Sequence, residues 1–123
     1  MTGKKKKILI VEDNPANLKM LKLILENIDC EILEAVEGEG ALSIAIENEP
    51  DLILMDIQIP HIDGLEVTRR LRKMEAFSQT PIIALTAFAM EKDEKAGLDA
   101  GCNEYMVKPF STTKLLKVVN KYL

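Results

Sequence analysis

Five short apolar runs recur along the chain, and each is followed by a segment in which apolar residues return at helical spacing. Residues 8–11, 51–55 and 81–85 lack polar alternation, as expected of strands buried on both faces of a parallel sheet. Two further strands are expected at 31–36 and 104–107. This order predicts an α/β fold in which one five-stranded parallel sheet carries helices on both faces.

The helices are expected where apolar residues recur every three or four positions. In the first of them Leu18, Leu21, Leu25 and Ile28 have helical spacing, Pro15 suits the first turn, and Asp13 or Asn14 is a suitable cap. The fourth helix has few large apolar residues and contains Gly97, so we expect it to be held loosely. The expected helices cover residues 16–28, 40–47, 64–74, 90–98 and 111–123.

No linker divides the 123 residues, so we expect one domain over residues 6–123, preceded by a basic leader at 1–5. The net charge of −4 and the absence of Trp argue against nucleic acid and anionic membranes as partners. No apolar run approaches the roughly 20 residues that span a bilayer, and the first residues do not resemble a secretory signal. Cys30 and Cys102 form no CxxC pair. These features predict a cytoplasmic protein with reduced thiols.

Polar residues follow the expected strands at the points where these end. Glu12 and Asp13 follow the first strand, and Asp56 follows the third. Thr86 closes the fourth strand, and Lys108 follows the fifth. In open parallel sheets the carboxyl ends of the strands meet at one edge, where ligands bind. We therefore expect three carboxylates, a hydroxyl and an ammonium group to converge there.

Such a cluster has a definite chemistry. Two carboxylates about 4 Å apart repel each other by roughly 4 kcal/mol, so a proton or a cation must compensate them. Hard oxygen ligands with no Cys and no nearby His suit Mg²⁺, with Mn²⁺ as a substitute. A carboxylate can also attack phosphorus to give an aspartyl phosphate, with Lys108 neutralising the transferred group and Thr86 bonding one of its oxygens. Taken singly, each residue is equally well a helix cap, a turn residue or a surface residue; together they favour the phosphoryl chemistry.

Four segments, in a fixed order and spacing, carry a resemblance to a known family. They are residues 10–14 (IVEDN), 54–60 (LMDIQIP) with Asp63-Gly64, 83–87 (IALTA) and 105–110 (YMVKPF). Through them the chain resembles the receiver domain of bacterial response regulators, either as a stand-alone protein or as part of a hybrid kinase in a phosphorelay. The resemblance implies a flavodoxin-like, doubly wound (βα)5 fold with strand order 2-1-3-4-5, and it covers residues 6–123.

The resemblance also implies a role for each polar residue at the sheet edge. Asp56 matches the phosphoacceptor, and Lys108 matches the lysine that contacts it. Glu12 and Asp13 match the acidic pair that holds Mg²⁺, together with Asp56 and the backbone carbonyl of Gln58. Because Glu12 is longer than the Asp that is frequent at its position, we expect it to reach the metal through water.

Five further expectations concern the surroundings of this site. Thr86 matches the hydroxyl residue that moves toward the phosphoryl group, and Tyr105 matches the aromatic residue whose rotamer is coupled to it. The peptide bond Lys108–Pro109 is expected to be cis. Phe88 would shield the aspartyl phosphate from water. His61, the single histidine, is expected to be an exposed loop residue.

By resemblance, the phosphoryl donor is a sensor histidine kinase or a histidine phosphotransfer protein, and phosphorylation alters the binding of an unidentified downstream protein. Apolar residues extend beyond one stripe of the first helix, with Met20 and Leu23 at the far edge. These two side chains either pack against the last helix or dock a helical donor. The chain is expected to be a phosphoacceptor with intrinsic phosphotransfer and autodephosphorylation chemistry, and not an enzyme.

Two other classes of protein share this pattern of elements. An aspartyl-phosphate phosphatase usually carries a second Asp two residues after its nucleophile, where this chain has Gln58. A flavin-binding flavodoxin needs a phosphate-cradling loop after the first strand, and Glu12 and Asp13 would repel the flavin phosphate there. Both classes fit the residues less well than a phosphoacceptor does.

Overall fold

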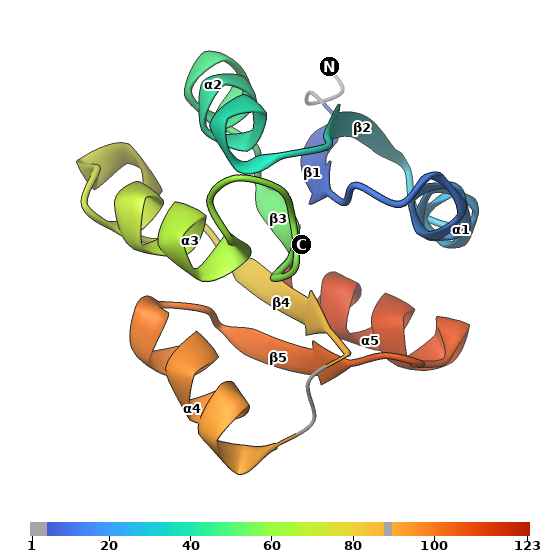
Figure 1. The fold of residues 1–123 in the computed structure, drawn as a ribbon. Coiled ribbons are helices and arrows are strands. Elements are labelled where there is room, and N and C mark those ends of the chain that lie inside the picture. Colours follow the sequence, from blue (N-terminus) through green and yellow to red (C-terminus); the bar gives the residue numbers. More distant parts are fainter. Residues whose placement is uncertain (1–4, 88–89) are drawn as a thin grey trace.

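The computed structural model describes residues 5–87 and 90–123, and it contains a five-stranded parallel sheet with helices on both faces (Figure 1). The strand order is β2-β1-β3-β4-β5, which confirms the expected doubly wound fold. The strands are β1 (Lys6–Val11), β2 (Cys30–Ala35), β3 (Leu52–Asp56), β4 (Ile82–Thr86) and β5 (Glu104–Val107). The helices are α1 (Pro15–Leu25), α2 (Gly38–Asn48), α3 (Gly64–Arg72), α4 (Glu91–Ala100) and α5 (Thr112–Tyr122).

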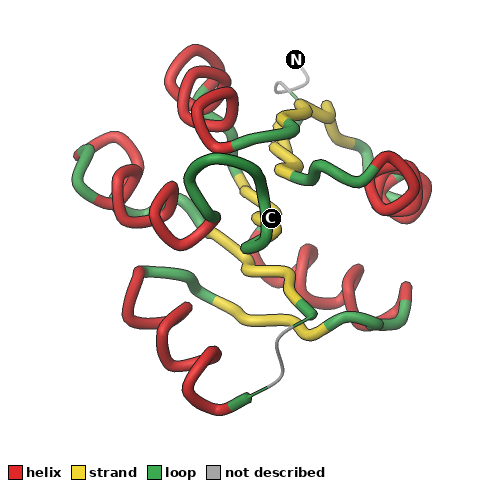
Figure 2. Tube along the Cα trace, in the orientation of Figure 1, coloured by secondary structure: helices red, strands yellow, loops and turns green. Residues whose placement is uncertain are grey.

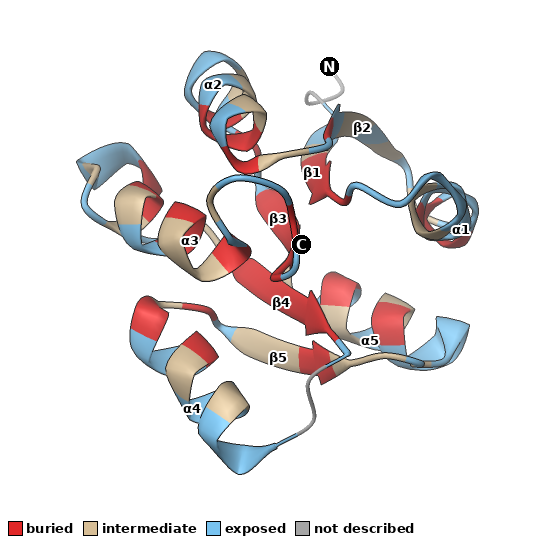
Figure 3. Ribbon diagram, in the orientation of Figure 1, coloured by how far each residue is buried: buried red, intermediate tan, exposed pale blue. Residues whose placement is uncertain are grey.

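The three central strands, β1, β3 and β4, lie between two hydrophobic cores, one on each face of the sheet. Every residue of β3 and β4 is buried, as the unbroken apolar runs predict. In Figure 1, α1 and α5 lie on one face, and α2, α3 and α4 lie on the other. The outer faces of these helices are exposed, while the central strands β3 and β4 between them are buried (Figure 3). Side chains that alternate along one strand therefore enter different cores, as Leu9 and Ile10 do.

Capping side chains account for the observed starts of α1 and α2. Asn14, and not Asp13, caps α1, because its side-chain oxygen accepts a hydrogen bond from the Asn17 amide at 3.0 Å. The glutamate at position 37 caps α2, so that this helix begins at Gly38, two residues before its expected start. The helix α1 ends at Leu25, three residues early, and a short 3-10 helix (Glu75–Phe77) was not expected.

The amino-terminal edge of the sheet is fastened by one arginine. The guanidinium of Arg72, at the end of α3, donates hydrogen bonds to the backbone carbonyls of Gly101 (3.0 Å), Phe77 (2.7 Å) and Thr80 (2.7 Å). It also donates to the side-chain oxygen of Asn103 at 2.8 Å. We call Arg72 with these four acceptors the Arg72 brace. It joins the end of α3 to the segments that precede β4 and β5.

Three expectations concern the whole chain. Both cysteines are free thiols, with Cys102 buried and Cys30 partly buried. Among the described residues, no helix combines the length and apolar character needed to cross a membrane. Residues 1–4 of the expected basic leader lie outside the described residues.

Candidate functional site

The polar residues at the carboxyl edge are positioned by hydrogen bonds that continue the sheet ladder beyond the strands. The backbone N–H of Glu12 donates to the carbonyl of Ala35 at 3.0 Å, and that of Lys108 donates to the carbonyl of Thr86 at 2.7 Å. Asp56 is the last residue of β3 and lies opposite Leu85 of β4. The backbone of each residue is thus fixed by a neighbouring strand, so the side chains start from defined points along one edge.

These side chains converge as expected. One carboxylate oxygen from each of Glu12, Asp13 and Asp56 lies within 4.8 Å of the other two. The Lys108 ammonium nitrogen lies 3.0 Å from a Glu12 oxygen and 3.4 Å from an Asp56 oxygen. Residues that are up to 96 positions apart in the sequence therefore form one cluster. We call these four residues the acidic cluster.

Burial makes this cluster electrostatically demanding. Glu12 and Asp56 are only 1% and 4% exposed, whereas Asp13 is exposed at the mouth of the site. One ammonium group faces three carboxylates, so the cluster carries excess negative charge when all are ionised. Buried charges of like sign raise one another's cost of ionisation, and a divalent cation would relieve it.

The pKa of Asp56 reflects this environment. It is raised from 3.8 to about 6, chiefly by burial and also by the adjacent Glu12 through a shared hydrogen bond and charge repulsion. A hydrogen bond from the Gln58 backbone amide and the charge of Lys108 act in the opposite direction. The Asp56 carboxylate therefore gains from a bound cation or from conversion to a derivative.

The loop after β3 orients the Asp56 carboxylate, a contribution that sequence reasoning did not identify. The Gln58 backbone N–H donates to one Asp56 oxygen at 3.0 Å. This loop arches beside the end of β3 and leads directly into α3 (Figure 2). Gly64 begins that helix so close to β3 that a Cβ atom would lie 2.5 Å from the Asp56 carbonyl oxygen. The Asp63-Gly64 pair therefore marks the point where the start of α3 packs closely against the end of β3, and Asp63 caps α3.

Glu12 has defined partners on both of its oxygens. One oxygen accepts a hydrogen bond from Lys108, and the other accepts one from the Asn14 backbone N–H at 3.1 Å. Our expectation of a water-mediated metal contact at Glu12 stays a prediction. Its pairing with Lys108 was not anticipated from the sequence.

Thr86 and Tyr105 are neighbours on the adjacent strands β4 and β5, and their switch roles stay a prediction. Thr86 is fully buried at the end of β4, and the partly buried Tyr105 stands beside it on β5, opposite Ala84. Burial raises the pKa of the Tyr105 phenol, and a hydrogen bond with Thr86 lowers it in part. The Tyr105 ring packs on Gly97 of α4, where a Cβ atom would lie 2.7 Å from the ring. Gly97 thus has a packing role, beyond the loosening of the helix that we inferred from its propensity.

Three other residues complete the account of the site. The Lys108–Pro109 bond is cis, as expected. His61 is exposed in the β3–α3 loop with a φ angle of 71°, and it takes no part in the cluster. Phe88 lies outside the described residues.

The donor set suits Mg²⁺ or Mn²⁺. Its atoms are carboxylate oxygens, and the exposure of Asp13 leaves room for the several water molecules that Mg²⁺ retains. No cysteine or histidine belongs to this set, so it does not favour zinc. The fit rests on the ligand chemistry and on the negative charge that Lys108 leaves uncompensated.

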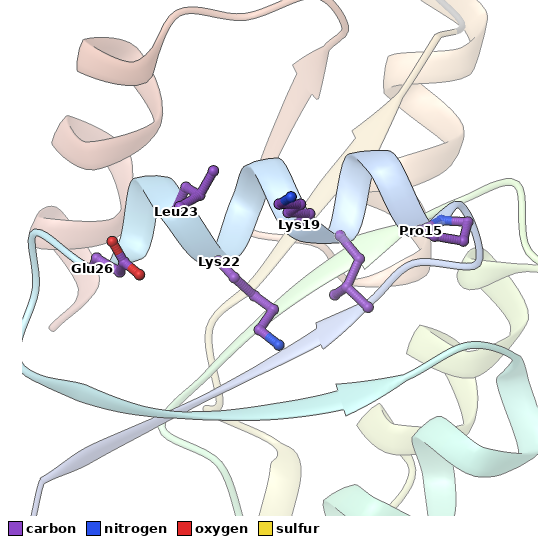
Figure 4. Close-up of a pocket in the computed structure, with 6 residues that line it drawn as sticks. Pro15, Lys19, Lys22, Leu23 and Glu26 are labelled. Carbon is purple, nitrogen blue, oxygen red and sulfur yellow. The ribbon is translucent and has the colours of Figure 1, made fainter.

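A groove on α1 lies beside the segment that leads from β1 into the site. It has a volume of about 280 Å³ and is lined by Pro15, Leu18, Lys19, Lys22, Leu23 and Glu26 (Figure 4). Leu23 is 53% exposed and Met20, which does not line the groove, is 41% exposed. The inward side of the helix, with Leu21, Ile24 and Leu25, packs in the core that contains α5. Met20 and Leu23 are therefore exposed and not buried against α5, and docking of a helical donor on them stays a prediction.

Comparison with known proteins agrees with this geometry. The family model described as the response regulator receiver domain matches residues 8–120. The polar-differentiation response regulator DivK of Brucella ovis is 42% identical over 118 residues, which is 96% of each chain.

Solved structures agree as well. The magnesium-bound receiver domain of the sensor histidine kinase PA1611 from Pseudomonas aeruginosa is 35% identical, with a TM-score of 0.89 over 97% of this chain and 98% of that one. The Mn²⁺-bound response regulator Rcp1 is 30% identical, with a TM-score of 0.79 over 94% and 90% of the two chains. The fold, the converging side chains and these matches agree, and the chain belongs to the response regulator receiver domain family of two-component signalling.

Proposed function

We propose that Asp56 accepts a phosphoryl group from a phosphohistidine of a sensor histidine kinase or a histidine phosphotransfer protein. An Asp56 carboxylate oxygen attacks the phosphorus, the oxygen–phosphorus bond forms, and the phosphorus–nitrogen bond breaks with its electron pair returning to the imidazole. The product is an acyl phosphate on Asp56. The single observation that carries this proposal is the convergence of a buried, oriented Asp56 with Asp13 and Lys108 at the carboxyl edge of the sheet.

Asp13, Asp56 and the Gln58 backbone carbonyl are the proposed direct ligands of a Mg²⁺ ion, with Glu12 contributing through water. Mn²⁺ would substitute for it. The ion supplies positive charge for the phosphoryl oxygens and for the excess carboxylates. The chain's own part is to hold Asp56 in place: the Gln58 N–H donates to one Asp56 oxygen at 3.0 Å, and the other oxygen faces Lys108 at 3.4 Å.

Lys108 and Thr86 complete the proposed chemistry. The Lys108 ammonium, 3.4 Å from Asp56, would bond the transferred group and neutralise part of its charge. The Thr86 hydroxyl would bond another phosphoryl oxygen. Because Tyr105 hydrogen-bonds Thr86 and packs on α4, a shift of Thr86 toward the phosphoryl group would alter the surface around Tyr105 and hence the binding of a downstream protein.

This role is that of a signalling switch and not of an enzyme acting on separate substrates. Residues 6–123 would form the working domain and residues 1–5 a basic leader. We place the protein in the cytoplasm, where its phosphoryl donors act. Nucleic acid and membranes are not among its proposed partners, in keeping with the net charge of −4.

Intact mass spectrometry tests the central reaction. After incubation with acetyl phosphate or phosphoramidate, we expect a gain of one phosphoryl group in the presence of Mg²⁺ and none after chelation with EDTA. Asp56→Asn should abolish the gain. Asp99→Asn, the same substitution at an exposed position of α4, is the matched control and should leave it intact. A phosphorylated Asp56→Asn variant would refute the assignment.

The donor is proposed to dock on α1 through Met20 and Leu23. In the Met20→Ser/Leu23→Ser double variant, we expect the rate of transfer from a phosphorylated histidine phosphotransfer protein to fall about tenfold or more, because exposed apolar side chains at a contact act as anchors. Phosphorylation by acetyl phosphate should be unchanged. The control is Ile46→Ser, which removes an apolar side chain of α2 that is 54% exposed. Equal transfer rates for the double variant and wild type would exclude this docking surface.

The proposed switch has its own test. Relaxation-dispersion NMR with and without beryllium fluoride, which mimics the phosphoryl group, should detect a change around Thr86 and Tyr105. An unchanged spectrum around these two residues would contradict the proposed switch and would leave the proposed phosphorylation of Asp56 standing.

A further inference from the structure

The Lys108 ammonium lies between two buried carboxylates, and it is closer to Glu12 than to Asp56. The nitrogen–oxygen distances are 3.0 Å and 3.4 Å. Glu12 is 1% exposed and Lys108 is 22% exposed, so the pair is largely shielded from water. A buried carboxylate needs a compensating charge, and in this arrangement Lys108 supplies it to Glu12 first.

Both oxygens of Glu12 are engaged, and this limits what else the side chain can do at the same time. One accepts from Lys108 and the other from the Asn14 backbone N–H, which is itself part of the turn into α1. The Asn14 bond anchors the carboxylate, because it comes from the backbone of the residue that caps α1. The oxygen facing Lys108 is held by a side chain and not by the backbone, so it is the one whose partner can change when a second cation enters the cluster.

The length of the Glu12 side chain is what makes this contact. With the backbone held by the hydrogen bond from Glu12 to Ala35, an aspartate at position 12 would place its carboxylate one methylene closer to β1. It would also lose the bond to the Asn14 amide in its present form. Lys108 would then have Asp56 as its nearer acceptor.

We infer that Glu12 is a positioning residue that holds Lys108 away from full engagement with Asp56 until a divalent cation is bound. When the cation is present, Glu12 exchanges Lys108 for the metal's hydration shell, and Lys108 contacts Asp56 and the incoming phosphoryl group. This inference rests on the proposed function, and it adds an order of events. Metal binding and release of Lys108 become one step, because the two cations compete for the same Glu12 oxygen.

A double-mutant cycle on Mg²⁺ affinity tests this competition. Isothermal titration calorimetry would give the Mg²⁺ Kd of wild type, Lys108→Met, Glu12→Asp and the double variant. Removal of Lys108 should tighten Mg²⁺ binding in both backgrounds, since a positive charge is lost near the site. The gains in the two backgrounds should differ by at least about threefold, which is the size expected of coupled neighbours. Equal gains in the two backgrounds would overturn the inference.

Controls separate a specific effect from a general one. Lys121→Met removes another lysine that is paired with a carboxylate, at 3.0 Å from Glu104, and should leave the Mg²⁺ Kd unchanged. Far-UV circular dichroism would verify the fold of each variant. Phosphorylation of wild type by acetyl phosphate is measured alongside. If it occurs while the two gains are equal, only the inference fails; if wild type neither binds Mg²⁺ nor becomes phosphorylated, the proposed function fails with it.

A second measurement needs no substitution. NMR spectra of the Lys108 ammonium should show a hydrogen-bond coupling between its nitrogen and the Glu12 carboxylate carbon in the metal-free wild-type protein. The coupling should disappear when Mg²⁺ is added to saturation. Its persistence at saturating Mg²⁺, or its absence in the metal-free protein, would contradict the exchange of partners.

Discussion

The two edges of the sheet handle buried charge in opposite ways. At the amino-terminal edge, the Arg72 guanidinium meets three backbone carbonyls and the Asn103 side chain, and each of these acceptors is neutral. At the carboxyl edge, three carboxylates share a single ammonium group. Burial lowers the pKa of Arg72 and raises that of Asp56, so both edges bear a desolvation cost. At the amino-terminal edge, hydrogen bonds within the chain offset this cost. At the carboxyl edge, the cost is only partly offset by Lys108.

This difference separates a structural use of charge from a functional one. The Arg72 brace has its partners within the chain, so it adds to stability without any ligand. The acidic cluster instead has excess negative charge, which a bound cation would reduce before a phosphoryl group is transferred. Because the site has uncompensated charge in the free protein, binding of a cation or a phosphoryl group can change its energy and its conformation.

The largest expected effect on stability is at the brace. Arg72→Met should lower the free energy of unfolding by about 2–4 kcal/mol, because four acceptors lose a charged donor. Urea denaturation measures it. The matched control is Arg69→Met on the same helix, where an exposed pair with Glu66 at 3.2 Å should contribute far less. Similar losses in the two variants would remove the contrast between the brace and an ordinary surface arginine.

The next effect has the opposite sign. Asp56 has a folded-state pKa of about 6 against an ordinary value of 3.8, so the folded chain binds this proton more tightly than the unfolded chain does. Protonated Asp56 therefore adds stability below about pH 4, and this contribution is lost as the pH rises through about 6. Asp56→Asn should exceed wild type by roughly 1–3 kcal/mol at about pH 8 and by almost nothing near pH 4.

Urea denaturation of both proteins across this pH range, without divalent cations, measures that difference. The same substitution at Asp99 is the control, because Asp99 is exposed on α4. A difference between Asp56→Asn and wild type that does not depend on pH would show that the carboxylate of Asp56 is not under electrostatic strain.

A smaller stabilisation is expected from the cation itself. At a Mg²⁺ concentration ten times the Kd, binding to the folded chain alone adds about 1.4 kcal/mol to the free energy of unfolding. The Tm should therefore rise with Mg²⁺ and return to its starting value with EDTA. Asp13→Asn should reduce this response, because Asp13 is the exposed carboxylate of the cluster. An equal rise in Asp13→Asn and wild type would place the cation elsewhere.

The smallest effect concerns a second pairing at the amino-terminal edge. The Tyr122 hydroxyl and the Lys121 ammonium donate to Glu104 at 2.6 Å and 3.0 Å, and these bonds lower the pKa of Glu104. Ionised Glu104 therefore adds stability above its unfolded-state pKa, and this contribution is lost as the pH falls through the lower folded-state pKa. Glu104→Gln should cost no more than about 1 kcal/mol at neutral pH and less in acid, measured by thermal denaturation. A cost that grows as the pH falls would contradict this sign.

The sequence is sufficient to predict the elements and the residues that gather at the carboxyl edge. Strands buried on both faces appear in the sequence as unbroken apolar runs. Because the carboxyl ends of parallel strands meet at one edge, Glu12, Asp56 and Lys108 are then expected to lie together. The cis Lys108–Pro109 bond followed from the resemblance alone.

The contacts within the cluster could not be predicted in the same way. Whether Lys108 pairs first with Glu12 or with Asp56 depends on differences of a few tenths of an ångström and on the Asn14 amide. The Arg72 brace was missed because its acceptors are mainly backbone carbonyls, which leave no trace in the residue types. The close packing of Gly97 on Tyr105 was also missed. A glycine in a helical segment indicates low helix propensity, and the sequence does not show whether another side chain packs against it.

The most direct test of the account is to locate the modified residue. After incubation with acetyl phosphate and Mg²⁺, borohydride reduces an acyl phosphate to an alcohol, which turns a phosphorylated aspartate into homoserine. Tandem mass spectrometry of the digested chain should find homoserine at position 56 alone, and only when Mg²⁺ was present. Homoserine at position 13, or at any other aspartate in place of Asp56, would contradict the central claim.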